Sequence, residues 1–120
     1  MKSAFERDLS LLFRRDALSP EEQVRDLLGR PDFVFRQEKV AVFAHGCYWH
    51  AHECLPQGHV TSPNQRKRRV DQIARDQHVR SELEREGWAV LVIWECHFRD
   101  SPEDVLKLIR HWRLRRLGHI

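Results

Sequence analysis

The sequence predicts an α/β fold in which a small mixed β-sheet is flanked by helices. Stretches with helical periodicity alternate along the 120 residues with short runs of β-branched and aromatic residues. The run WAVLVIWEC at residues 88–96 is apolar almost throughout, which is typical of a strand buried on both faces. A chain of this length builds one modest core, so we expect residues 1–120 to form a single domain.

Two helices are predicted before the first strand. The first begins at Ser3, which forms a capping box with Glu6, and its apolar residues recur at helical spacing: Phe5, Leu9, Leu12 and Phe13. It extends to Arg15. The second is short and covers SPEEQVRDLLG at residues 19–29, with a serine as its cap and a glycine at its end. A loosely wound connection is the alternative for this second segment.

A hairpin and two further helices accompany the apolar strand. PDFVF at residues 31–35 and KVAVFAHG at residues 39–46 are separated by three polar residues, which predicts an antiparallel hairpin whose second strand is central. A long surface helix with a thin apolar stripe is predicted over residues 64–86, and Gly87 ends it. The last helix begins at a Ser-Pro cap at residues 101–102 and continues past Trp112.

The composition excludes some classes of protein. With 41% hydrophobic and 32% charged residues and a net charge of +3, the chain is neither disordered by composition nor a polycation. Its three cysteines come without an apolar signal segment or a run of about 18 apolar residues. We therefore expect a cytoplasmic, bacterial-type location, no membrane partner, and thiolate bonds to a metal rather than disulfides.

The segment HGCYWHAHEC at residues 45–54 is rich in metal ligands. Cys47, His52 and Cys54 supply two thiolates and an imidazole, and Cys96, at the end of the apolar strand, could return beside them. A Cys3His set of this kind suits a four-coordinate, structural zinc ion. Three other histidines could take the place of His52: His45, His50 and His59. The alternative is that the cysteines are small buried hydrophobes.

A second group of residues suits metal-dependent phosphodiester hydrolysis. Asp32 lies on one hairpin strand and His45 ends the other, so antiparallel pairing can bring them to one end of the sheet, within reach of Glu6. Two carboxylates at a magnesium ion, with a histidine that positions water, are the minimum for this chemistry. His50 is a further candidate acid or base. Alternatively, Glu6 only caps its helix, Asp32 ends a turn, and the histidines lie on the surface.

Basic and aromatic residues indicate a nucleic-acid partner. Four cations open the long helix: Arg66, Lys67, Arg68 and Arg69. Such a run either attracts phosphates or forms a solvated helix face. Tyr48 and Trp49 lie in the ligand-rich segment, where a metal-held loop would present them for stacking on bases or wedging between them. The alternative is that one of the two packs against the sheet.

Three motifs in this order and spacing closely resemble the very short patch repair (Vsr-type) mismatch endonucleases: GRPDFVF, VAVFAHGCYWHAHEC and RDQHVRSELEREGWAVLVIWEC. The resemblance covers roughly residues 3 to 112. It implies a restriction-endonuclease-like core with a structural zinc, and magnesium-dependent nicking of one DNA strand beside a T:G mismatch, the product of 5-methylcytosine deamination. The implied partner is mismatched double-stranded DNA, bound at the nucleoid by a monomer.

The resemblance also implies a role for each motif residue. Asp32 would bind magnesium, with the backbone carbonyl of Ala44 available to the same ion, and His50 would handle water near the scissile phosphate. His45 would occupy the second catalytic histidine position, and Glu6 would be the family's helix-one glutamate. The implied zinc ligands are Cys47, His52, Cys54 and Cys96, and the implied aromatic wedge beside the mismatch is Tyr48 with Trp49.

Departures from the family pattern bear on specificity. Ala44 stands where the family usually has a threonine, and we expect catalysis to survive the loss of that hydroxyl. The chain begins five residues before Glu6, so we expect no DNA-embracing arm, and SPNQRKRRVDQI lacks the tryptophan expected early in the long helix. Binding should then depend more on phosphate contacts. Two other functions stay open, a non-catalytic zinc-stabilised DNA-binding module and a nuclease for restriction or defence.

Overall fold

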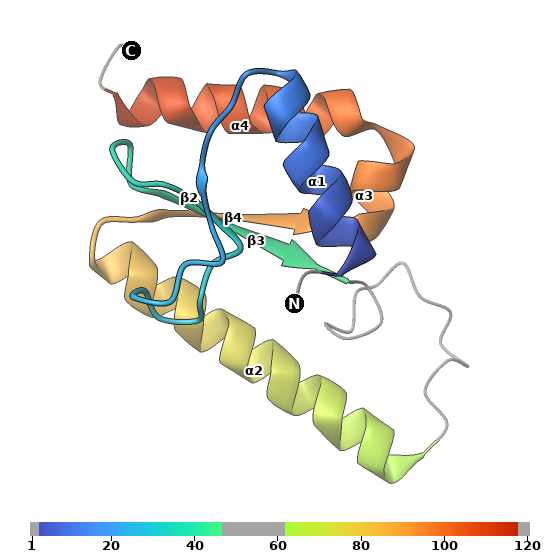
Figure 1. Cartoon of the computed structure of the whole chain (residues 1–120). Coiled ribbons are helices and arrows are strands. Elements are labelled where there is room, and N and C mark those ends of the chain that lie inside the picture. Colours follow the sequence, from blue (N-terminus) through green and yellow to red (C-terminus); the bar gives the residue numbers. More distant parts are fainter. Residues whose placement is uncertain (1–2, 47–61, 118–120) are drawn as a thin grey trace.

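The computed structural model describes residues 3–46 and 62–117, in which a sheet of order β1-β2-β3-β4 lies between two layers of helices (Figure 1). The strands are β1 (Glu21–Glu22), β2 (Phe33–Phe35), β3 (Val40–His45) and β4 (Ala89–Trp94). The helices are α1 (Ala4–Arg15), α2 (Pro63–Arg85), α3 (Glu95–Asp100) and α4 (Pro102–Arg116). Helices α1, α3 and α4 cover one face and α2 covers the other. The predicted small mixed sheet flanked by helices is confirmed.

The predicted hairpin is also confirmed. Strands β2 and β3 are antiparallel, with Phe33 opposite Val42. Strand β3 is an inner strand and pairs in parallel with β4, so that His45 lies opposite Trp94 where both strands end. Strand β4 is at an edge of the described sheet, yet most of its residues are buried because helices cover both of its faces.

The two faces of the sheet follow the period of two that a pleated strand imposes. Val40 and Val42 join the core beneath α1 and α4, whereas Ala41 and Phe43 join the core beneath α2. The core beneath α2 is the smaller of the two. His45 is the next β3 residue on that side, and it therefore lies where the apolar packing against α2 ends.

Helix α2 touches the sheet along only part of its length. Leu83 is its single buried residue, and Val79 is half-buried against the sheet. Val70, nearer the N-terminal end, is 64% exposed, because this half of the helix extends past the sheet (Figure 1). The helix begins at a capping box formed by Ser62 and Gln65. No helix in the described parts of the chain is long and apolar enough to cross a membrane.

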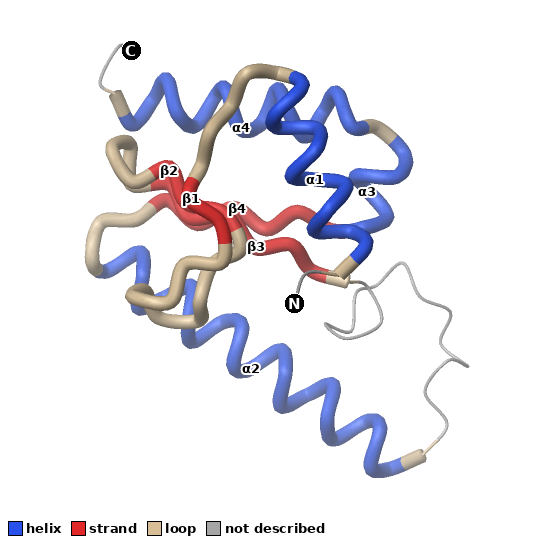
Figure 2. The backbone as a smooth tube through the Cα atoms, viewed as in Figure 1, coloured by secondary structure: helices blue, strands red, loops and turns tan. Residues whose placement is uncertain are grey.

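The helix predicted at residues 19–29 is wrong. We call residues 19–31 the strap, which runs from the end of α1 across the edge of the sheet (Figure 2). Two of its backbone N–H groups pair with carbonyls further along the chain, since Gln23 donates to Asp32, just beyond the strap, at 3.0 Å and Val24 to Pro31, the last strap residue, at 3.2 Å. These bonds and the β1–β2 pairing replace those that a helix would form internally.

The strand predicted at residues 88–96 is shorter than expected. It ends at Trp94, and Cys96 is the second residue of α3 rather than the end of a strand. Trp94 is the N-cap residue of α3, so the backbone turns into a helix immediately after the sheet. Cys96 nevertheless follows closely on the residue that pairs with His45.

Candidate active site

The hairpin holds Asp32 at one end of the sheet. Its backbone N–H donates to the carbonyl of Val42 at 3.0 Å, and its side-chain Oδ2 accepts from the N–H of Ala44 at 2.7 Å. Asp32 is two residues before Val34, which belongs to the core beneath α2, so the alternation of a strand directs it to the same side. The predicted meeting of Asp32 with the end of β3 is confirmed.

Glu6 reaches this end of the sheet from the first turn of α1. Its Oε1 accepts from the hydroxyl of Ser3 at 3.2 Å, and its Oε2 accepts from the side-chain amide of Gln23 at 2.8 Å. The hydroxyl of Ser3 in turn accepts from the backbone N–H of Glu6 at 3.2 Å, as a cap does. Glu6 thus takes part in the helix cap and also lines the candidate site. The capping role and the site role considered from the sequence are therefore compatible.

The environment of Asp32 disfavours a negative charge. Burial raises the pKa of Asp32 to about 7, the N–H of Ala44 opposes this shift, and the nearby negative charge of Glu6 adds to it. A divalent cation between the two carboxylates would offset both the burial and the repulsion. Carboxylate oxygens are ligands that magnesium accepts in proteins, usually one or two of them together with water and phosphate oxygens.

His45 ends β3 on the side that α2 covers. The residue is only 7% exposed, and its ring lies beside those of Phe43 and Trp94, with centroids 6.0 Å and 5.1 Å away. Its Nδ1 atom is 4.0 Å from Oδ2 of Asp76 on α2. The imidazole is therefore held among aromatic rings with one nitrogen toward a carboxylate, rather than lying on the surface.

Two α2 residues in the site were missed from the sequence. Asp76 faces His45, and the side-chain amide of Gln72, one turn earlier, donates to Oδ1 of Asp76 at 2.9 Å. A sequence signal for this pair was present. Gln72 and Asp76 lie on the same side of the helix as Val79 and Leu83, so two polar residues stand where further apolar residues would be expected.

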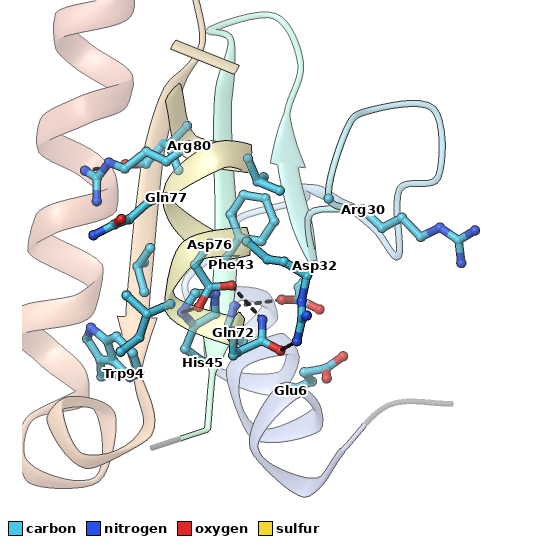
Figure 3. Close-up of a pocket in the computed structure, with 17 residues that line it drawn as sticks. Glu6, Arg30, Asp32, Phe43, His45, Gln72, Asp76, Gln77, Arg80 and Trp94 are labelled. Carbon is cyan, nitrogen blue, oxygen red and sulfur yellow. Dashed lines mark hydrogen bonds and ion pairs between the residues drawn. The ribbon is translucent and has the colours of Figure 1, made fainter. Parts of the chain in front are cut away.

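A cavity of about 610 Å³ joins these groups. Glu6, Asp32, Ala44 and His45 line it from α1 and the hairpin, opposite Gln72 and Asp76 from α2. In Figure 3, Asp32, Gln72, Asp76 and His45 lie close to one another at one end of the cavity, whereas the side chain of Arg30 points away. The lining also includes Arg75 and Arg80, so cations border a group of carboxylates and an imidazole, a combination that suits a phosphate substrate.

Several predicted site residues lie outside the described residues. These are Cys47, Tyr48, Trp49, His50, His52 and Cys54. Of the predicted zinc ligands, the structure describes Cys96, which is half-buried just beyond the end of β4. Within residues 3–46 and 62–117 no group of three or more His, Cys, Asp or Glu side chains is arranged to hold a metal ion.

The predicted basic run occupies the first two turns of α2. Arg66, Lys67 and Arg68 are exposed, and Arg69 is half-exposed. The first turn carries no acidic residue, although the partial positive charge at a helix N-terminus favours anions there. Four cations at this end therefore do not stabilise the helix, and their charge is available to an anionic partner.

A family model and a curated relative identify the same family. The family model for DNA mismatch endonuclease Vsr matches residues 6–56. The DNA mismatch endonuclease Vsr of Escherichia coli strain K12 is 35% identical over 116 residues, which cover 92% of this chain and 74% of that protein. The type II nicking enzyme V.XorIIP of Xanthomonas oryzae pv. oryzae is 40% identical over 82 residues. That match covers 63% of this chain, which spans only 57% of the relative's length.

A solved structure shares the fold. The catalytic domain of the homing endonuclease I-Bth0305I superimposes with a TM-score of 0.65 at 16% identity, over 96% of this chain and 98% of that domain.

Proposed function

Because the chain belongs to the family of DNA mismatch endonucleases Vsr, we propose that it is a magnesium-dependent endonuclease that nicks one strand of duplex DNA beside a T:G mismatch. The observation that carries this proposal is the presence of Glu6, Asp32 and His45 around one cavity. Single-strand cleavage is supported by relatives that are named as nicking enzymes. The family resemblance predicted from the three motifs is confirmed. Specificity for a T:G mismatch and dependence on magnesium go beyond family membership and are part of the proposal.

The donor set fits a magnesium ion. Asp32 and Glu6 offer hard oxygen atoms, and the raised pKa of Asp32 reflects a buried carboxylate beside a like charge, which a cation would stabilise. Ala44 offers a backbone carbonyl at the same place in the sheet. Bound magnesium would neutralise charge on the phosphoryl oxygen and lower the pKa of a coordinated water molecule.

The protein's own side chains would then orient the reactants. The N–H of Ala44 holds the carboxylate of Asp32, so a cation bound there would have a fixed position relative to the sheet. His45, with Asp76 behind its Nδ1 atom, would orient or deprotonate the attacking water. His50 would share this role, as the histidine that handles water near the scissile phosphate. Arg75 and Arg80 at the edge of the cavity would attract the DNA backbone.

A structural zinc ion held by Cys47, His52, Cys54 and Cys96 belongs to the same proposal. It is supported by the soft donor set and by the register of the parallel strands, since His45 and Trp94 pair where β3 and β4 end. Cys47 and Cys96 each follow these paired residues by two positions in the sequence. The zinc would anchor the segment that carries Tyr48 and Trp49, and these would wedge into the duplex beside the mismatch.

The test is a nicking assay on a panel of end-labelled duplexes. Matched, T:G-mismatched and 5-methylcytosine-containing duplexes of one sequence are incubated with magnesium or with a chelator, and denaturing gels report breaks in each strand. We expect a break in one strand of the T:G duplex alone, only with magnesium. Cleavage of every duplex would indicate restriction or defence instead, and a bound but intact T:G duplex would indicate a binding module.

A further inference from the structure

Gln23 in the strap is hydrogen-bonded to Glu6 and to Asp32, two of the three carboxylate residues that line the site. Its side-chain Nε2 donates to Oε2 of Glu6 at 2.8 Å. Its backbone N–H donates to the carbonyl of Asp32 at 3.0 Å. One residue outside both α1 and β2 therefore connects the carboxylate that comes from the helix with the residue that comes from the hairpin.

The backbone of Gln23 adopts a left-handed conformation to make these bonds. Its φ is 54°, in the left-handed region that residues other than glycine rarely adopt. The residue is held there from both sides, because Glu22 pairs with Phe33 and the buried Val24 donates to the carbonyl of Pro31. A strained residue that its neighbours fix in place is expected where geometry matters for function.

Stability alone does not explain the side-chain contact. Gln23 is exposed, and its bond to Glu6 joins two groups that water can also reach. Such a bond contributes little to folding, because water competes for both of its partners. What the contact does determine is the direction of the Glu6 carboxylate, whose other oxygen already accepts from Ser3.

We propose that Gln23 is a positioning residue that holds the carboxylate of Glu6 at a fixed place beside Asp32, so that both serve the same divalent cation. The inference rests on the proposed function. An amide of this length is required, because asparagine is one methylene shorter and glutamate would bring a third negative charge beside the two carboxylates. The amide also donates without adding charge, so the negative charge of Glu6 and Asp32 stays available to the cation.

The test compares Gln23→Asn with Gln37→Asn. Asparagine tolerates a left-handed backbone, so Gln23→Asn keeps the strap and removes only the reach to Glu6. Gln37 is an exposed glutamine in the β2–β3 turn, at the opposite end of the hairpin from Asp32, and serves as the matched control. Two quantities are measured for each protein, the single-turnover nicking rate and the rise in melting temperature that added magnesium chloride causes.

We expect Gln23→Asn to nick about tenfold more slowly or worse, as when a group that orients a metal ligand is lost, and to show a smaller magnesium-induced rise in melting temperature. Gln37→Asn should match the wild type in both. In a Glu6→Ala background, adding Gln23→Asn should cause no further loss of rate, because the two residues act through one carboxylate.

Two results would overturn the inference. One is a magnesium-induced change in melting temperature that is equal in Gln23→Asn and the wild type. The other is a full additional loss of rate when Gln23→Asn is combined with Glu6→Ala. If the wild type nicks no duplex, the proposed function fails, and the melting comparison still decides whether Gln23 positions a cation ligand.

Discussion

The Nδ1 atom of His45 lies 4.0 Å from Oδ2 of Asp76, and the two residues come from adjacent layers, the end of β3 in the sheet and the middle of α2. The other oxygen of Asp76 accepts from Gln72 at 2.9 Å, so its own helix holds the carboxylate. Helix α2 is therefore more than a cover for the sheet. It supplies one wall of the site and the group that faces the buried histidine.

Replacement of Asp76 should affect catalysis more than binding. A carboxylate beside an imidazole fixes its orientation and stabilises its protonated form, so we expect Asp76→Asn to lower the nicking rate about tenfold or more with little change in DNA affinity. Asp71→Asn, on the exposed face of the same helix, is the control and should nick at the wild-type rate. Equal rates for all three proteins would exclude a role for Asp76.

The stability of the metal-free protein should depend on pH through Asp32. Burial and the charge of Glu6 raise the pKa of Asp32 from 3.8 to about 7 in the folded protein. The folded state therefore binds this proton more tightly than the unfolded chain, and stability falls as the pH rises between these two values. Above the folded-state pKa, Asp32 is ionised in both the folded and the unfolded protein, so its contribution to the free energy of unfolding no longer changes with pH.

Asp32→Asn should remove this dependence. Without magnesium, we expect the variant to exceed the wild type by about 1–3 kcal/mol in free energy of unfolding at about pH 8, and to show no such gain at about pH 4. Urea denaturation of both proteins over this range provides the measurement. A difference that is independent of pH would contradict the assignment of the raised pKa to Asp32.

The basic run on α2 should determine how steeply DNA binding depends on salt. Replacing Arg66, Lys67, Arg68 and Arg69 together by glutamine should weaken binding and reduce the slope of log affinity against log salt by about 2–4, since each phosphate contact contributes about 0.9. Arg85→Gln is the control, because Arg85 lies at the other end of α2 and pairs with Glu82 at 3.1 Å. A slope unchanged in the quadruple variant would mean that DNA binds elsewhere.

Gly29, a residue of the strap, packs closely against α2 and should not tolerate a side chain. Its φ is 77°, and an added Cβ would lie 2.5 Å from Cγ1 of Val79. We expect Gly29→Ala to destabilise the protein by about 1–3 kcal/mol and to slow nicking, because the strap leads directly to Asp32. Adding Val79→Ala should recover part of the rate by relieving the collision. If Gly29→Ala is as stable in urea as the wild type, the close packing of Gly29 against Val79 is excluded.

Local patterns predicted three of the four strands in the described sheet, β2, β3 and β4, and the part of the site that lies on them. Alternation in residues 31–35 and 39–46 predicted the hairpin, and the pairing of its strands brought Asp32 beside the end of β3 where His45 lies. These predictions succeeded because register and side-chain direction in a hairpin are set by neighbouring residues. The roles of His50 and of the zinc ligands stay predictions.

Contacts between distant segments explain what the sequence did not reveal. The strap has a cap, a proline and a terminal glycine like a helix, yet its amides bond to Pro31 and Asp32, a tertiary effect that local propensity does not include. Asp76 and Gln72 were not singled out from the sequence, because polar residues occur along the whole of α2. The packing of Val79 and Leu83 on the sheet is what turns that side of α2 toward the site.

The decisive measurement is single-turnover nicking of a T:G duplex by Asp32→Ala, with binding of the same duplex and thermal unfolding measured in parallel. If Asp32 holds the divalent cation at the scissile phosphate, this variant will fold and bind DNA while its nicking rate falls below detection. An Asp32→Ala protein that still nicks the duplex at the wild-type rate would contradict the assignment of this cavity as the active site.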